Sequence, residues 1–470
     1  MAVTPFDIPE LVRRISLFVS VKDALSCVLV AKSWSDHFLS VVWFHIDFHT
    51  QLRFTTLPLD VVAKHGRHIR IVENARSFRR VYVLANASVA RLRELHIETT
   101  GSARQHVHAY EVVSRNIRSL EIIHLFAASD PDDMDKHDSS VHYVSVPALV
   151  PFFGASEGIA SKLKILRLSE LCLTHDGLVA ILQASPQLYE LALGGTEIVG
   201  KATQSFQHLG MKMLYASVEC ISQVYPFGPP LLSHFPSLTI LSTWQDDPDL
   251  TIPTAKIKED IARYCPYLTA FELEQPSTLL SCFCMHIGRN ISELTFDYEH
   301  ISLEGITAIL LHQATLRQLM VFGASPDVDL EADEVPAVSR HFQEFSQLLQ
   351  LIPRGCPHLE TFDLALHEMD MDEVEMGEWT CKGLTTLRIR VKGLDTKETI
   401  QKAIVLWRAG CKRRYQEEED KEMEGFEEET KRAMRLNGMD SSIEARVARH
   451  LLKFEHLDDV WLGYKSWTST

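Results

Sequence analysis

Apolar residues recur along most of the chain in one short pattern. Hexapeptides of the form apolar-x-x-apolar-x-apolar include LKILRL at Leu163, LYELAL at Leu188 and LTTLRI at Leu384. The hexapeptides that form a recurring series begin at Leu92, Ile117, Leu163, Leu188, Met211, Leu238, Leu268, Ile291, Leu316, Leu359, Leu384 and Leu457. Successive starts lie 25, 46, 25, 23, 27, 30, 23, 25, 43, 25 and 73 residues apart. Alternation within each hexapeptide indicates a strand with one buried face, and a period of roughly 20 to 29 residues indicates a stacked repeat.

Helical periodicity fills several of the intervals between these strands, as in residues 177–183, 257–264 and 306–311. A proline then often precedes the next strand, as in Cys265-Pro-Tyr-Leu and Cys356-Pro-His-Leu. Proline ends a helix and favours extended backbone at the residue before it. We therefore expect an α/β fold in which parallel strands line the concave face of a solenoid and helices line its convex face. Cys265 and Cys356 are expected to be buried thiols at helix ends.

The N-terminal segment has a different character. Residues 5–48 contain 25 apolar residues in 44, about 57% against 46% for the whole chain. Leu11, Val12, Ile15, Phe18 and Val19 recur at helical spacing, and the stretch 24–31 is apolar almost throughout. A bundle of this size cannot bury so many apolar groups by itself and usually needs a covalent staple or a partner.

This segment resembles an F-box. The resemblance rests on Ile8-Pro9-Glu10-Leu11 with Ile15, on the run from Asp23 to Trp34, and on Trp43. It implies a three-helix unit that docks on a Skp-type adaptor, which supplies the missing apolar cover. Carried over by position, the adaptor-facing or bundle-core residues would be Ile8, Pro9, Leu11, Ile15, Leu25, Val28, Val30 and Trp34. The alternative is that these helices cap the repeat array.

The Cys-Pro-x-Leu units resemble the cysteine-containing class of leucine-rich repeat. Together the two parts resemble the F-box/leucine-rich-repeat family, the substrate receptors of Skp, cullin and F-box ubiquitin ligases. That resemblance implies an adaptor and, through it, a cullin as partners, a target protein on the solenoid, and no catalytic residue or cofactor. The expected organisation is a bundle over residues 1–48, a linker or cap over 49–91, and a solenoid over 92–470. The alternative function is a protein-interaction scaffold without ligase activity.

A charged helical insertion is expected near the C-terminus, at about residues 395–445, where Glu417–Asp420 and Glu427–Glu429 are acidic runs. With 47 Lys and Arg against 63 Asp and Glu, the net charge is −16, which argues against binding to nucleic acid or to an anionic membrane. The nine cysteines include no C-x-x-C pair and the N-terminus lacks a signal-peptide pattern. We therefore expect a cytoplasmic or nuclear location.

Side chains that alternate with the buried ones along each strand form the candidate target-binding surface. Two aromatic residues, Trp244 and Phe322, are predicted on this outward side and flank several acidic residues. The candidate target-binding residues are Trp244, Glu272, Glu274, Glu293, Asp297, Met320 and Phe322. They suggest a surface for a basic segment of a target, with the aromatic residues as anchors. Alternatively, an insertion or the C-terminal segment of the chain covers these aromatic side chains.

Other chemistry is weakly indicated. Residues 154–158 match G-x-S-x-G around Ser156, but the preceding Val150-Pro-Phe-Phe makes the required strand doubtful, and a hydrolase is the least favoured function. Cys282, Cys284 and His286 alternate like ligands, yet a structural zinc site needs a fourth. We expect no metal site, and buried thiols are the better explanation for the two cysteines.

Overall fold

The computed structural model describes residues 8–50, 57–87, 89–100, 103–128, 144–145, 161–200, 205–222, 230–244, 254–273, 291–297, 303–322, 346–394, 396–419, 442–462 and 465–468. The chain divides into two compact units. Unit 1 comprises Met1–Leu238 with Asp246–Ile252, and unit 2 comprises Thr239–Gln245 with Pro253–Thr470. No helix among the described residues is both long and apolar enough to cross a membrane.

Three helices form the N-terminal part of unit 1: α1 (Pro9–Ser16), α2 (Val21–Val30) and α3 (Lys32–Val42). Pro9 occupies the first turn of α1, where its missing N–H costs no hydrogen bond. Ser20 caps α2 by accepting a hydrogen bond from the backbone N–H of Asp23 at 3.2 Å. Helices α1 and α2 both pack on α3, and the buried centre between the helices consists of Val12, Ala24 and Phe38.

The remainder of unit 1 is a parallel sheet with helices between its strands. The strand order is β1-β2-β3-β4-β6-β8-β10. The strands are β1 (His45–Asp47), β2 (Ile71–Ala75), β3 (Glu94–Thr100), β4 (Ile122–Ala128), β6 (Ile165–Ser169), β8 (Glu190–Gly194) and β10 (Met213–Ala216). The helices are α4 (Leu59–His65), η3 (Gly66–His68), α5 (Phe78–Asn86), α6 (Ala103–Asn116), α8 (His175–Ala184), α9 (Val218–Ser222) and η5 (Leu231–His234). The segment expected to be a linker or cap, 49–91, thus contains α4, β2 and α5, and β2 pairs with β3.

A second parallel sheet of three short strands also belongs to unit 1. It has the order β5-β7-β9, with β5 (Val144–Ser145), β7 (Leu171–Thr174) and β9 (Glu197–Val199). Strands β7 and β9 follow β6 and β8 after one or a few residues, so two successive repeats each contribute to both sheets. The hexapeptide pattern gives no sign of this second sheet.

Unit 2 has the strand order β11-β12-β13-β14-β15-β16-β17-β18. The strands are β11 (Ile240–Thr243), β12 (Ala270–Leu273), β13 (Glu293–Asp297), β14 (Gln318–Phe322), β15 (Thr361–Met369), β16 (Thr386–Val391), β17 (Asp459–Leu462) and β18 (Lys465–Thr468). The helices are α10 (Thr254–Tyr264), α12 (Leu303–Leu310), α14 (Ser346–Leu349), α15 (Leu351–Gly355), α16 (Met371–Glu375), α17 (Lys397–Glu419) and α19 (Ile443–Leu451). All pairings from β11 to β17 are parallel, whereas β18 pairs with β17 in the antiparallel sense.

The repeat pattern locates the strands accurately. Eleven of the twelve predicted hexapeptides begin two residues before an observed strand, as Leu163 does for β6 and Leu384 for β16. The prediction at Ile117 is wrong by three residues, because Leu120 occupies the first position and β4 begins at Ile122. The pairing of Ile122 with Glu94 fixes this register, which turns Ile123 and Leu125 into the core.

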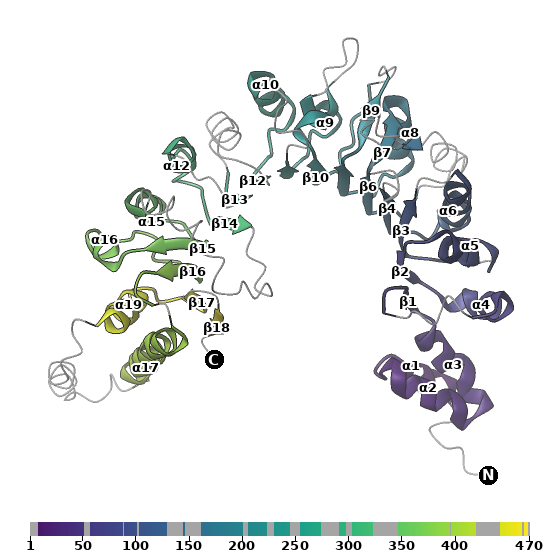
Figure 1. Ribbon diagram of the computed structural model, residues 1–470, viewed down its shortest axis with the longest axis horizontal. Coiled ribbons are helices and arrows are strands. Elements are labelled where there is room, and N and C mark those ends of the chain that lie inside the picture. Colours follow the sequence, from purple (N-terminus) through teal and green to yellow (C-terminus); the bar gives the residue numbers. More distant parts are fainter. Residues whose placement is uncertain are drawn as a thin grey trace, which may run out of the picture. The chain divides into compact units, whose positions relative to one another are not determined.

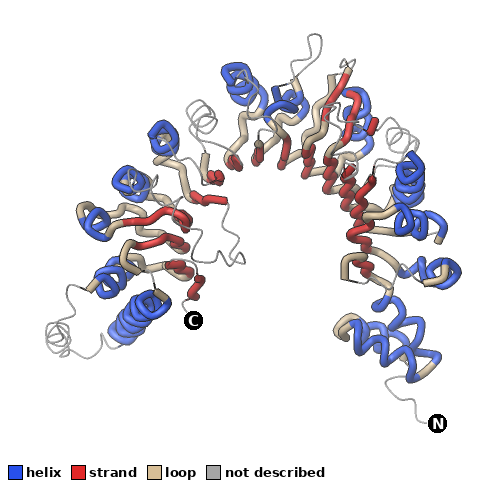
Figure 2. Tube along the Cα trace, viewed as in Figure 1, coloured by secondary structure: helices blue, strands red, loops and turns tan. Residues whose placement is uncertain are grey.

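In each unit the helices lie on one face of the parallel sheet and leave the other face free of described helices (Figures 1 and 2). We call this second face the open face of that unit. Where their side chains are described, the first, fourth and sixth residues of the correctly placed hexapeptides point toward the helices and are buried, for example Leu188, Leu191 and Leu193. The predicted α/β fold with a parallel sheet and helices on one of its faces is therefore confirmed.

Helix α17 covers the start of the predicted charged insertion, and its first half is packed into unit 2. Ile400, Ala403, Ile404 and Trp407 are buried and recur at helical spacing, so an apolar stripe lies within a highly charged sequence. Helix α17 packs against α19. A charged insertion is expected to project from the repeats, but this half of it is part of the packed unit, so that expectation is wrong here. Residues 420–441, including Glu427–Glu429, lie outside the described residues.

Candidate functional site

The N-terminal bundle exposes more large apolar side chains than it buries. Helix α1 and its N-cap present one stripe of such residues, and α2 presents another, because residues spaced by three or four share a helix face. The exposed set, which we call the bundle surface, is Ile8, Leu11, Ile15, Leu17, Phe18, Val21, Leu25, Leu29 and Val30. Leu29 is 87% exposed and Phe18 is 89% exposed. Exposed apolar residues at this density are typical of a docking surface rather than of a free protein surface.

The predicted adaptor-binding residues divide into two groups. Ile8, Leu11, Ile15, Leu25 and Val30 are exposed and belong to the bundle surface. Val28 and Trp34 instead pack against the bundle core, with the Trp34 ring 5.8 Å from that of Phe38. Pro9 is the first residue of α1, and its side chain lies outside what the structure describes.

Four exposed residues were not singled out from the sequence: Leu17, Phe18, Val21 and Leu29. Phe18 was expected to lie on the apolar side of the first helix. Helix α1 ends at Ser16, so Phe18 follows the helix and does not share its buried side. The signal that could have identified Leu29 is its position four residues after Leu25 within a helix that is apolar almost all round.

The predicted target-binding residues of unit 2 occupy neighbouring strands. Glu272 on β12 is the Cα partner of Thr295 on β13, and Thr295 is the partner of Met320 on β14. Glu293 is exposed and lies two residues before Thr295, on the same open face. The structure therefore brings Glu272, Glu293 and Met320 together on three adjacent strands.

The other predicted target-binding residues are less fully described. Trp244 is half-buried and directly follows β11. Asp297 and Phe322 are Cα partners at the ends of β13 and β14, but their side chains are not described. Glu274 lies outside the described residues, as do Ser156, Cys282, Cys284 and His286.

The predicted exposure of the outward side is wrong at several positions, of which Ser242 and Thr295 are examples. Ser242 is 1% exposed and Thr295 is 4% exposed. For Thr295 the reason is visible in the register, because its short side chain stands between those of Glu272 and Met320 on the flanking strands. Thr295 is therefore not accessible to a partner, whereas the longer side chains of Glu272 and Met320 beside it are partly exposed.

On the open face of unit 2, an arginine on β16 forms ion pairs with both neighbouring strands. The Arg388 guanidinium on β16 lies 3.2 Å from Asp363 on β15 and 3.2 Å from Asp459 on β17. It also lies over the Trp461 ring, 4.6 Å from the centroid. Asp363 therefore does not extend the acidic surface at Glu272 and Glu293, because its charge is already balanced by Arg388.

The open face of unit 1 has a different chemistry, rich in histidine and in ion pairs. The imidazoles of His96 on β3 and His124 on β4 stack 3.9 Å apart and 9° from parallel. Burial, together with the neighbouring His96 and Arg167, lowers the pKa of His124 to about 3. Arg167 on β6 pairs with the buried Glu190 on β8 at 2.6 Å. None of these residues was singled out from the sequence.

The two cysteines of the Cys-Pro-x-Leu units are buried free thiols. Cys265 and Cys356 directly follow α10 and α15 and are 4% and 0% exposed, so the prediction of buried thiols at helix ends is confirmed. Burial raises the pKa of both thiols to about 12. Such thiols are poor nucleophiles near neutral pH.

No protein-family model matches the chain, and no curated protein matches its sequence. Among solved structures, the complex of Rad7 and Elc1 in yeast has a chain 12% identical to this one, with a TM-score of 0.35. That match covers 83% of this chain and 84% of the other. An internalin from Listeria monocytogenes is 11% identical, with a TM-score of 0.30, over 70% of this chain and 83% of its own.

Proposed function

We propose that the chain is a non-catalytic receptor that joins two proteins. Its N-terminal bundle docks on a Skp-type adaptor and, through it, on a cullin, while its leucine-rich-repeat units hold a target protein. The observation that carries this proposal is the bundle surface, whose nine large apolar residues contrast with a core of three buried residues. In such an assembly the receptor acts by proximity, because it raises the effective concentration of the target near a ubiquitin-charged enzyme.

The energy available from covering the bundle surface is substantial. Burying a large aliphatic or aromatic side chain contributes about 1.5 to 3 kcal/mol. Phe18 and Leu29 are almost fully exposed, so covering these two alone would contribute about 3 to 6 kcal/mol before the costs of association. A partner with a complementary apolar groove is the simplest source of that cover.

The contacts of the bundle within unit 1 favour docking over a capping role. Asp36 on α3 pairs with Arg67 in η3 at 3.4 Å, and Trp43 after α3 stacks on His65 of α4, 4.8 Å between ring centroids. The bundle thus meets the repeats through α3 and the residue after it. Leu25 and Leu29 on α2 are exposed instead of packed against the repeats, which a purely capping bundle does not require.

The remaining features fit an intracellular receptor. The described cysteines are all free thiols, as is usual for proteins of the cytoplasm and nucleus. The open faces of both units carry polar and charged side chains suited to recognising a protein. We infer that the target contacts unit 2 through Glu272, Glu293 and Met320, with Trp244 at the edge, and that a basic segment is the best match for the two glutamates.

Co-purification with a Skp-type adaptor tests the proposal. The double variant Leu25→Asp/Leu29→Asp should lose adaptor binding by at least about tenfold, because each carboxylate would be buried without a partner in the complex. Its own fold should persist, since both positions are exposed. The matched control is Leu209→Asp, which alters a leucine that is 70% exposed elsewhere in unit 1 and should leave adaptor binding unchanged.

Equal adaptor binding by the double variant and the wild type would contradict the proposal. To separate a ligase receptor from an adaptor-bound scaffold, the reconstituted complex with cullin should be tested for ubiquitin transfer to proteins that co-purify with a chain lacking residues 1–48. If the chain is a ligase receptor, the complex transfers ubiquitin to at least one of these proteins, and the transfer requires the intact bundle surface. A scaffold binds the adaptor without such transfer.

A further inference from the structure

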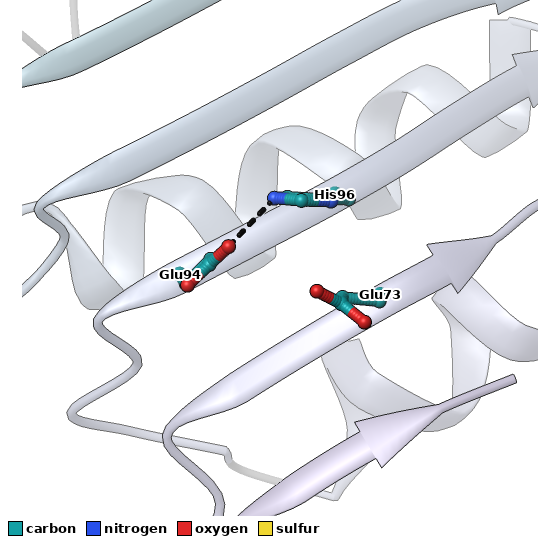
Figure 3. A group of neighbouring side chains, drawn as sticks. All are labelled: Glu73, Glu94 and His96. Carbon is teal, nitrogen blue, oxygen red and sulfur yellow. Dashed lines mark ion pairs between the residues drawn. The ribbon is translucent and has the colours of Figure 1, made fainter. Parts of the chain in front are cut away.

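Three potential metal ligands converge on the open face of unit 1. Glu73 lies on β2, and Glu94 and His96 lie on β3 (Figure 3). One ligand atom from each residue lies within 4.8 Å of the others. The closest pair is His96 Nε2 and Glu94 Oε1, 3.0 Å apart. Among the described residues this is the one such group of three or more.

The backbone explains how these side chains come together. Glu94 and His96 alternate on β3 and so project from the same face of the sheet. Strand β2 carries a bulge, because Val72 pairs with Leu95 but Ala75 pairs with Ile97. Glu73 and Asn74 therefore both stand opposite His96. Asn74 adopts the left-handed conformation, with φ of 57°, as the extra residue of a bulge often does.

The bulge is held by polar contacts on both sides. The Asn74 side-chain amide donates a hydrogen bond to Asp47 Oδ1 on β1 at 2.8 Å. Arg80 Nη1 in α5 donates to the Asn74 carbonyl oxygen at 3.0 Å. Glu73 is thereby fixed in position at the backbone, and only its side chain remains to adjust to a ligand.

The surroundings orient the His96 imidazole. The stacked ring of His124 fixes the plane of the imidazole from one side. The side chains of Glu73, Glu94 and His96 are 30%, 23% and 26% exposed, while the His96 Nε2 atom itself is buried and makes no hydrogen bond within the described part of the chain.

The charges nearby leave the two carboxylates without a strong cation. Among the described residues, Glu73 pairs with His45 Nε2 at 2.9 Å and Glu94 pairs with His96. The neighbouring arginines are engaged elsewhere, Arg76 with Glu98 at 3.0 Å and Arg167 with Glu190. A divalent cation would compensate both carboxylates at once.

We propose that Glu73, Glu94 and His96 bind a divalent transition-metal ion, for which zinc is the best match. Imidazole nitrogen and carboxylate oxygen are both zinc ligands, and a zinc site with three protein ligands is completed by water. The separation of His96 Nε2 and Glu94 Oε1 is close to the roughly 3.4 Å between two ligands that each lie about 2.1 Å from a tetrahedral zinc ion. A small rotation of the Glu73 side chain brings the third ligand in, and His45 then supports that carboxylate by its hydrogen bond.

Calorimetric titration of the metal-stripped full chain with zinc chloride tests this site. The variant His96→Phe removes the ligand and keeps an aromatic ring against His124. Its affinity for zinc at this site should fall at least about tenfold, the scale of loss when even a supporting partner of a ligand is removed. The matched control is His108→Phe, which alters a histidine on α6 paired with Glu111 at 3.1 Å and should leave the titration unchanged.

Thermal unfolding provides a second readout. Zinc should raise the Tm of the wild type and of His108→Phe in a concentration-dependent way, because it binds the folded state, and should leave the Tm of His96→Phe unchanged. If His96→Phe fails to fold, Glu73→Gln on the neighbouring strand takes its place. Zinc binding of equal affinity and stoichiometry in the wild type and in the folded ligand variant would overturn the inference. Adaptor co-purification should be unaffected by His96→Phe. The metal site and adaptor docking are therefore tested independently of each other.

Discussion

The imidazole of His450 packs edge-on against the indole of Trp379, with 4.6 Å between the ring centroids and 82° between their planes. His450 belongs to α19, is 4% exposed and lies in the core of unit 2. Trp379 is anchored in turn by a hydrogen bond that its indole N–H donates to Gln350 Oε1 at 2.9 Å. A titratable ring is thus held among aromatic side chains, where its charged form is strongly disfavoured.

The stability of unit 2 should therefore fall in mild acid. Burial, together with nearby Lys453 and Lys382, lowers the pKa of His450 from 6.5 to about 3. Between these two pH values the unfolded chain binds a proton at His450 and the folded chain does not. The free energy of unfolding therefore decreases as pH falls below about 6.5. The His450 contribution is about 2 kcal/mol of unfolding free energy lost at pH 5 relative to pH 8.

Chemical denaturation of the wild type and of His450→Leu at pH 8 and pH 5 measures this effect. The loss of stability on acidification should be smaller in His450→Leu by about the amount above. The matched control is His456→Leu, because His456 is exposed and its replacement should preserve the wild-type pH dependence. An identical pH dependence in His450→Leu and the wild type would refute the assignment.

The bundle offers a direct contrast between two phenylalanines. Phe38→Ala should destabilise the bundle by about 3 to 5 kcal/mol, because Phe38 is 2% exposed and its removal leaves a cavity. Phe18→Ala should change stability by no more than about 0.5 kcal/mol, since Phe18 is 89% exposed. Urea denaturation followed by helical circular dichroism compares the two variants, and similar losses in both would show that Phe18 is part of the core.

The bulge on β2 makes a prediction about backbone conformation. Asn74→Ala and Asn74→Gly both remove the hydrogen bond to Asp47, but only glycine adopts positive φ without a steric cost. Asn74→Ala should therefore be less stable than Asn74→Gly by about 1 to 2 kcal/mol. Differential denaturation of the two variants checks this, and equal stability would mean that β2 relaxes to a regular register when the asparagine is lost.

Charge reversal tests the acidic surface of unit 2. Once a target is in hand, Glu272→Lys/Glu293→Lys should weaken its binding at least about tenfold, because lysines would face a basic segment. Glu304→Lys makes a suitable control, since Glu304 is exposed in the first turn of α12. Binding measured at low and high salt should show the wild-type affinity falling with ionic strength. Retained affinity in the double variant would exclude recognition through these glutamates.

The repeat register was predictable because each hexapeptide buries the same three positions against its own helix. Leu188, Leu191 and Leu193 sit in such a hexapeptide, and no distant contact is needed to orient them. The misplaced start at Ile117 has a local cause. Ile117, Leu120 and Ile122 fit the same template as Leu120, Ile123 and Leu125, and only pairing with β3 distinguishes the two.

The candidate sites were less predictable because they depend on neighbouring strands and on exceptions to the pattern. Strand β2 was missed since Asn74 stands where the template requires an apolar residue. The approach of Glu73 to His96 then follows from a bulge, which spacing alone does not reveal. The bundle surface, in contrast, was largely anticipated from composition, because an excess of apolar residues in a short segment must remain partly exposed.

The exposure of Phe18 and Leu29 also bears on the behaviour of the chain when it is alone. Two nearly bare apolar side chains on a small bundle favour concentration-dependent self-association in water. A stoichiometric partner that covers them would prevent this self-association. The concentration of soluble receptor in a cell would then depend on the concentration of that partner. The bundle surface that binds the partner would thus also control the abundance of the receptor.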